Sequence, residues 1–223
     1  MIKFDDLHKS FTRKIYVPVI GDVMATRWAY EALTVEQFKS NRFEKPFFKY
    51  DMELSRNEWN TSFLIPVLKV KVDECIAAGK REEYRELSKN NFMKLNYHIR
   101  ELYELARISP GTWMSDMNYE RFTEYTGTQA KVFLDSARSV MRGNMKMITV
   151  SRDSLYKVLT NKMGEARLLR LRETDYNNKL ADFVLNRLAV SKIYESERRL
   201  IQKSDPVFMP PGSKHGRAHF YAP

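Results

Sequence analysis

Apolar residues recur along most of this chain at the spacing of an amphipathic α-helix, and strict alternation typical of a half-buried strand is scarce. Gly143 and Asn144 are expected to end one helix, and residues 145–150 (MKMITV) are the one candidate for a short strand. The pattern therefore predicts helices over residues 22–41, 55–78, 80–107, 118–140, 152–172 and 174–203.

Capping and helix-breaking residues set the expected ends of these helices. Asp22 is expected to cap the first helix, and Ser55 with Glu58 three residues later matches the capping-box pattern for the second. Pro66 is expected to kink that second helix, because its ring cannot donate a backbone hydrogen bond. Gly79 is expected to end it, since glycine readily adopts the positive φ that closes many helices.

The predicted fold is all-α, an antiparallel bundle of five or six helices with extended N- and C-terminal segments. The 223 residues are enough for one well-packed core, or for one core with an appendage. There are only eight prolines, and four of them lie in the last 18 residues, so the middle of the chain favours long helices. We expect three regions along the chain, over residues 1–52, 53–203 and 204–223.

Positive charge is concentrated in the second half of the chain. The net charge is +10, and residues 131–172 hold ten Lys/Arg against three Asp/Glu, which accounts for +7. Arg138, Arg142 and Lys146 are four residues apart, so a continuous helix would align them as one stripe. Such a stripe can bind anionic lipid headgroups, an acidic partner or nucleic acid phosphates, and the alternative is an ordinary solvated surface.

Motifs of common catalytic and cofactor sites are absent from the sequence. It contains no phosphate-binding glycine loop, no HExxH metal motif and no GxSxG nucleophile elbow. Cys75 is the single cysteine, which excludes disulfides within the chain, and its apolar helical surroundings predict a core position. His215 and His219 are interpreted as exposed residues of a basic tail. We therefore predict no catalytic, metal or cofactor residues in this chain.

One segment resembles a known family. Residues 26–38 (TRWAYEALTVEQF) are similar to a segment that follows the fifth membrane helix of G-type (white-type) ABC transporters, at the outer face of the membrane. The wider stretch 16–48 and the ending 205–223 (DPVFMPPGSKHGRAHFYAP) resemble fused ATPase–permease chains of the Bacteroidetes, which carry a long soluble insert before the final membrane helix. The positions that match the family pattern are Arg27, Trp28, Ala29, Tyr30, Glu31, Ala32, Leu33, Val35 and Phe38.

The resemblance implies a location and a set of partners. The chain would be a non-catalytic domain at the periplasmic face of the inner membrane, contributing to recognition of a substrate or partner at the permease exit. Residues 1–52 would be the membrane-proximal segment with an interfacial helix, and residues 204–223 would return to the next membrane helix. The permease and ATPase domains of the same polypeptide would be its partners, and ATP and Mg would bind there and not to this chain. An anionic lipid surface or an envelope protein would be a further partner.

Physical chemistry leaves two interpretations of the family segment open. Trp28, Tyr30 and Phe38, together with Arg27 and Glu31, have the aromatic and charged character of a membrane interface. The same residues can equally pack against the helical bundle. The alternative function is a stand-alone basic helical adaptor or nucleic-acid-binding module, and an unrecognised hydrolase is a third hypothesis.

Overall fold

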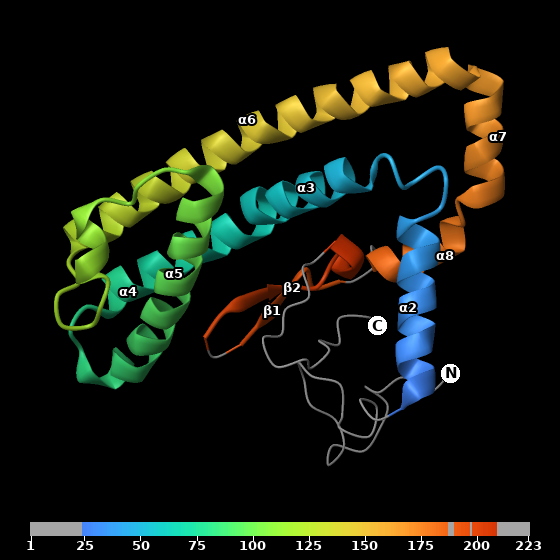
Figure 1. The fold of residues 1–223 in the computed structure, drawn as a ribbon. Helices are drawn as coiled ribbons and strands as arrows, with labels where there is room; N and C mark the ends of the chain where they lie inside the picture. The colour runs from blue at the N-terminus through green and yellow to red at the C-terminus, as the bar shows by residue number, and fades with distance from the viewer. Residues whose placement is uncertain (1–23, 187–189, 197, 209–223) are drawn as a thin grey trace. The chain divides into compact units, whose positions relative to one another are not determined.

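The structure is a computed structural model, which describes residues 24–186, 190–196 and 198–208. It is mainly helical, with one two-stranded sheet (Figure 1). The helices are α2 (Ala25–Lys39), α3 (Phe48–Trp59), α4 (Ile65–Ala78), α5 (Arg85–Ala106), α6 (Glu124–Met163), α7 (Glu165–Asp175) and α8 (Asn178–Leu185), and the strands are β1 (Ile193–Glu195) and β2 (Leu200–Gln202). A π-helical turn (Asn60–Leu64) joins α3 to α4 without a break. Counted with α3 and α4 as one continuous helix, the described residues form six α-helices, which confirms the predicted all-α class.

The described residues divide into two compact units. Unit 1 takes its residues from Met1–Arg56, Ile148–Lys192 and Gln202–Pro223, and unit 2 consists of Asn57–Met147 and Ile193–Ile201. Each unit is therefore assembled from separate stretches of the chain. The predicted extended terminal segments lie largely outside the described residues, as do His215 and His219.

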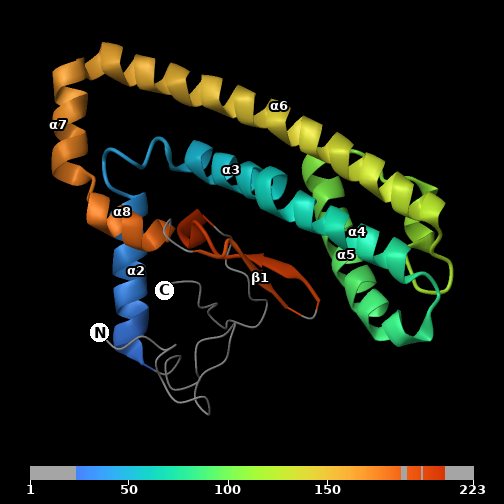
Figure 2. The same ribbon diagram turned by 180° about the vertical axis from the view of Figure 1, so that it is seen from behind.

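The core of unit 2 lies between α4, α5 and the N-terminal part of α6. Helices α4 and α5 pack against each other, as both views of the ribbon show (Figures 1 and 2). Leu68, Leu95 and Leu134, one from each of these helices, are completely buried. Removing such side chains from water is the dominant favourable contribution to folding. The periodic apolar positions of the sequence thus form one shared core.

The core of unit 1 is smaller and more aromatic. Phe38 of α2 packs among apolar residues of α8 and contacts the rings of Tyr176 and Phe208, each at a centroid distance of 6.1 Å. Two ion pairs add long-range contacts, from Arg42 to Asp175 and from Arg152 to Asp51, each with a shortest nitrogen–oxygen distance of 2.6 Å.

One predicted feature of the second helix, its N-cap, is wrong. The helix begins at Phe48, so Ser55 is not its N-cap but lies inside α3, where its hydroxyl donates a hydrogen bond to Asp205 at 2.9 Å. Pro66 is the second residue of α4 and follows directly on the π-helical turn, an irregularity of the kind found at helix kinks. The predicted end at Gly79 is confirmed, with φ of 56°.

Several predictions for the second half of the chain are wrong, among them the single helix over residues 152–172, which the structure divides at Gly164. Helix α6 continues through Gly143 to Met163, so neither the break there nor the strand over residues 145–150 exists. One glycine inside a helix lowers its stability by only about 1 kcal/mol relative to alanine, and the other residues of a long helix can offset this loss. The last predicted helix instead stops at Leu185, where Asn186 adopts a φ of 46°, and β1 and β2 follow.

Two glycines of α6 provide a matched test of helix packing. A Cβ atom at Gly127 would lie 2.7 Å from Cδ1 of Ile76, whereas a Cβ at Gly143 would meet nothing within 4 Å. We expect Gly143→Ala to raise the free energy of unfolding by about 0.5–1 kcal/mol, because alanine restricts the unfolded chain more. Gly127→Ala is expected to be less stable than Gly143→Ala by about 1–3 kcal/mol, because Ile76 must shift. Urea denaturation of both variants measures this difference, and equal stabilities would contradict the close approach of α6 to α4.

Candidate functional site

The basic stripe lies on unit 2. Arg138, Arg142 and Lys146 all belong to α6, so the helix persists through the segment and places them on one side. Arg142 and Lys146 are exposed, and Arg138 is partly buried with its Nε lacking a hydrogen-bond partner. Within the described residues, none of the three forms an ion pair. The exposure of Arg142 and Lys146 makes their charge accessible to an external anion.

The charged residues on the preceding turns of α6 differ from the basic stripe, because they form ion pairs with residues of α4. Lys131 of α6 pairs with Asp73, and Asp135 of α6 pairs with Lys69 of α4 at 2.6 Å. Two exposed apolar residues of this stretch, Val140 at 36% exposure and Met147 at 70%, lie on other sides of the helix than Arg142. Exposed cations on one side of a helix suit electrostatic contact with anionic headgroups.

The family segment forms α2 of unit 1, and its aromatic residues have different environments. Phe38 is 2% exposed and belongs to the core, so the packing interpretation holds for it. Trp28 is 39% exposed and Tyr30 is 47% exposed, and Glu31 is exposed too. Arg27 lies in the same helix, but its side chain is outside the described set. Two of the three aromatic residues thus remain accessible to a partner or a membrane.

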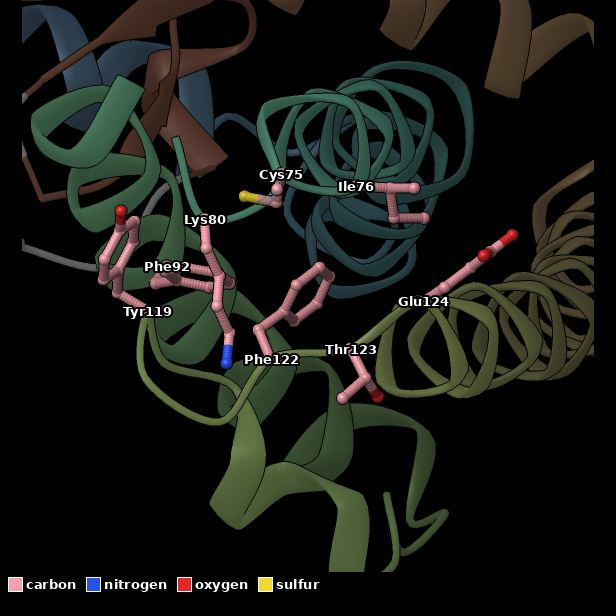
Figure 3. A pocket seen from close by; sticks show the side chains of 9 residues that line it. Cys75, Ile76, Lys80, Phe92, Tyr119, Phe122, Thr123 and Glu124 are labelled. Carbon is pink, nitrogen blue, oxygen red and sulfur yellow. The ribbon is translucent and has the colours of Figure 1, made fainter. Parts of the chain in front are cut away.

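A pocket of about 130 Å³ in unit 2 was not anticipated from the sequence. It lies where the end of α4 meets α5 and the start of α6 (Figure 3). The spacing of its residues looked like ordinary core packing, so the sequence carried no signal for it. The pocket is lined by Cys75, Ile76, Gly79, Lys80, Phe92, Tyr119, Phe122, Thr123 and Glu124.

Cys75 lies in the wall of this pocket and is 2% exposed. Burial raises the pKa of its thiol to about 12, an effect that the hydrogen bond with Asn91 only partly offsets. The thiol therefore stays protonated at neutral pH. Because the thiolate is the nucleophilic form, this environment does not activate Cys75. The predicted core position of Cys75 is confirmed.

The raised thiol pKa predicts a loss of stability in alkali. Between the ordinary value of 9.0 and about 12, the unfolded chain releases a proton that the folded chain retains, so stability falls as pH rises. We expect this thiol to contribute a loss of about 2 kcal/mol between pH 8 and pH 10.5, at 1.36 kcal/mol per unit. Urea denaturation of the wild type and Cys75→Ala across this range isolates that contribution. Parallel curves would contradict it.

A buried polar cluster joins the β-hairpin to α4 and α5. Lys71 and Lys94 are 7% and 6% exposed, and both donate to the same carboxylate oxygen of Glu195, at 2.7 and 2.8 Å. His98 is 2% exposed, and its Nε2 accepts a hydrogen bond from the backbone N–H of Leu200 at 2.8 Å. Its Nδ1 therefore carries the proton and donates to Glu101 at 2.9 Å. This cluster holds the hairpin in place and leaves no free lone pair on His98.

No protein-family model, curated protein or solved structure matches this chain. Across the described ranges, no group of three His, Cys, Asp or Glu residues is arranged to hold a metal ion. Within the same ranges, none of the helices has the length and apolar content needed to cross a membrane.

Proposed function

We propose that this chain is a non-catalytic domain on the extracytoplasmic side of a G-type ABC transporter, located between its last two membrane helices. Its role is to contribute to recognition of a substrate or partner at the permease exit. The observation that carries the proposal is the helical conformation of residues 26–38, the segment that resembles the family, and the burial of its side chains. These residues form α2, which buries Phe38 in the core and leaves Trp28 and Tyr30 partly exposed.

The exposed side of α2 that holds Tyr30 suits a membrane interface, whereas Trp28, two residues earlier, lies on another side of the helix. Phe38 packs α2 against the core of unit 1, so Trp28 and Tyr30 are exposed on a helix that is itself held in the fold. Leu33 on the same helix is 70% exposed, which adds apolar surface. Tryptophan and tyrosine are enriched at the depth of lipid headgroups because one end of each side chain is apolar and the other polar. The permease and ATPase domains of the parent polypeptide would supply transport, ATP binding and Mg binding.

The reading frame of the gene tests the transporter assignment directly. We expect codons for an apolar stretch of about 18 or more residues before residue 1, and for another soon after residue 223. An intact reading frame that lacks both stretches would rule the assignment out. This test is independent of any property of the isolated chain.

The basic stripe predicts binding to anionic membranes. A cation near an anionic bilayer contributes about 1 kcal/mol, so Arg142→Gln with Lys146→Gln should weaken binding by about 2 kcal/mol, or about 30-fold. Vesicle co-sedimentation with phosphatidylglycerol, and with phosphatidylcholine as the neutral reference, measures the effect. We expect the wild type to bind only the anionic vesicles.

A matched control separates local charge from net charge. Lys69→Gln with Lys89→Gln removes the same charge from lysines that are paired with Asp135 and Glu86. We expect this control to lose much less binding than the stripe variant. Equal losses, or no loss in either variant, would refute the stripe as a lipid contact. Salt-sensitive retention on DNA, without vesicle binding, would instead favour the nucleic-acid-binding alternative.

A further inference from the structure

We propose that the pocket at the end of α4 binds a neutral, single-ring organic molecule with one polar substituent, of the phenol class. The inference rests on the shape and chemistry of unit 2, and does not depend on the transporter assignment. It is carried by the volume of the pocket, by its aromatic wall, and by the two opposite charges at its rim.

The size of the pocket sets the size of the ligand. An apolar cavity of about 150 Å³ accommodates benzene. The volume here is about 130 Å³, so one six-membered ring fits and a fused pair of rings does not. Gly79, which ends α4 with a positive φ, belongs to the lining and contributes no side chain to it.

The wall of the pocket suits an aromatic ring. The rings of Phe92 and Phe122 have centroids 5.0 Å apart and planes tilted by 58°, and Tyr119 supplies a third ring to the lining. Ile76 and the protonated thiol of Cys75 complete the apolar part. Aromatic rings favour tilted or edge-to-face neighbours, so a bound ring gains contacts beyond simple burial.

The polar groups of the pocket favour a neutral ligand. Lys80 and Glu124 are both exposed and carry opposite charges, and in Figure 3 the carboxylate of Glu124 points away from the rings. The hydroxyl groups of Thr123 and Thr126 form a hydrogen bond with each other, with 3.0 Å between their oxygen atoms. Apart from Lys80 and Glu124 the lining holds no charged side chain, so a charged ligand would lose its hydration without a charged partner inside the pocket. A hydroxyl at the mouth, in contrast, can exchange hydrogen bonds with either charge or with water.

Titration of phenol into protein labelled at the isoleucine methyl groups tests the proposal. We expect a saturable shift of the Ile76 methyl signal with a dissociation constant of about 1 mM, which is reasonable for a ligand of seven heavy atoms. Ile65 and Ile99 are buried in the core away from the pocket lining and serve as internal references. Benzoate and benzylammonium are expected to bind at least about ten-fold more weakly.

Two variants change the volume of the pocket in opposite directions. Cys75→Met fills the pocket and should weaken phenol binding at least about ten-fold. The control is Gly143→Ala, which lies outside the pocket and should leave phenol binding unchanged. Phe122→Ala widens it and should admit 2-naphthol, which the wild type excludes; this arm keeps the test decisive if Cys75→Met does not fold. Equal shifts at all isoleucines, no saturable shift at Ile76, or tighter binding of either charged analogue would overturn the proposal.

Discussion

Replacing Glu195 with glutamine is expected to lower the free energy of unfolding by about 3 kcal/mol, because two buried ammonium groups then lose the carboxylate that they share. The side chains of Lys71 and Lys94 are each 8% exposed, whereas that of Glu195 is 51% exposed. Burial acts to raise the pKa of Glu195, but hydrogen bonds and charge from the two lysines outweigh it, and the pKa lies below its ordinary value. The stabilisation is therefore present at neutral pH and is lost as the carboxyl is protonated in acid.

The same substitution at the protein surface is the control. Glu86 pairs with Lys89 at 3.2 Å and its side chain is 83% exposed, so Glu86→Gln should cost less than about 0.5 kcal/mol. Adding Lys71→Met and Lys94→Met to Glu195→Gln should recover most of the loss, since no buried charge remains. If Glu195→Gln cost no more than Glu86→Gln, the lysines would not depend on this carboxylate. Urea denaturation at pH 7 measures all three proteins.

Leu134→Ala should destabilise unit 2 by about 3 kcal/mol, because it opens a cavity where α6 packs against α4 and α5. Leu134 is completely buried, and the surrounding helices can collapse only partly around a smaller side chain. Tryptophan fluorescence is the appropriate probe, since Trp59 and Trp113 both belong to the core of unit 2. The third tryptophan, Trp28, lies in unit 1, so chemical denaturation followed at this signal reports mainly, but not solely, on the unit that contains the change.

Val132→Ala is the matched control for this cavity. Val132 lies two residues earlier on the same helix and is 56% exposed, so its truncation should change stability by less than about 0.5 kcal/mol. Similar losses in the two variants would show that α6 does not present this face to the core.

Short-range information in the sequence was enough to predict the helical class and several helix ends. The apolar residues of α4 and α5 recur every three or four positions, and this spacing alone defines a buried face. Gly79 marks the end of α4 because its conformation is a local property of glycine. The alignment of Arg138, Arg142 and Lys146 follows from helix geometry once α6 is continuous.

Packing between distant residues decided the rest. Residues 193–202 form a hairpin and not the end of a helix. In this hairpin Glu195 contacts Lys71 and Lys94, and Leu200 contacts His98. Each of these partners is more than 100 positions away in the sequence. The burial of Phe38, the position of Ser55 beside Asp205 and the pocket around Cys75 likewise depend on neighbours remote in sequence. Periodicity reports which face of an element is apolar, but it does not report which other element covers that face, because that choice is made by the summed contacts of the whole fold.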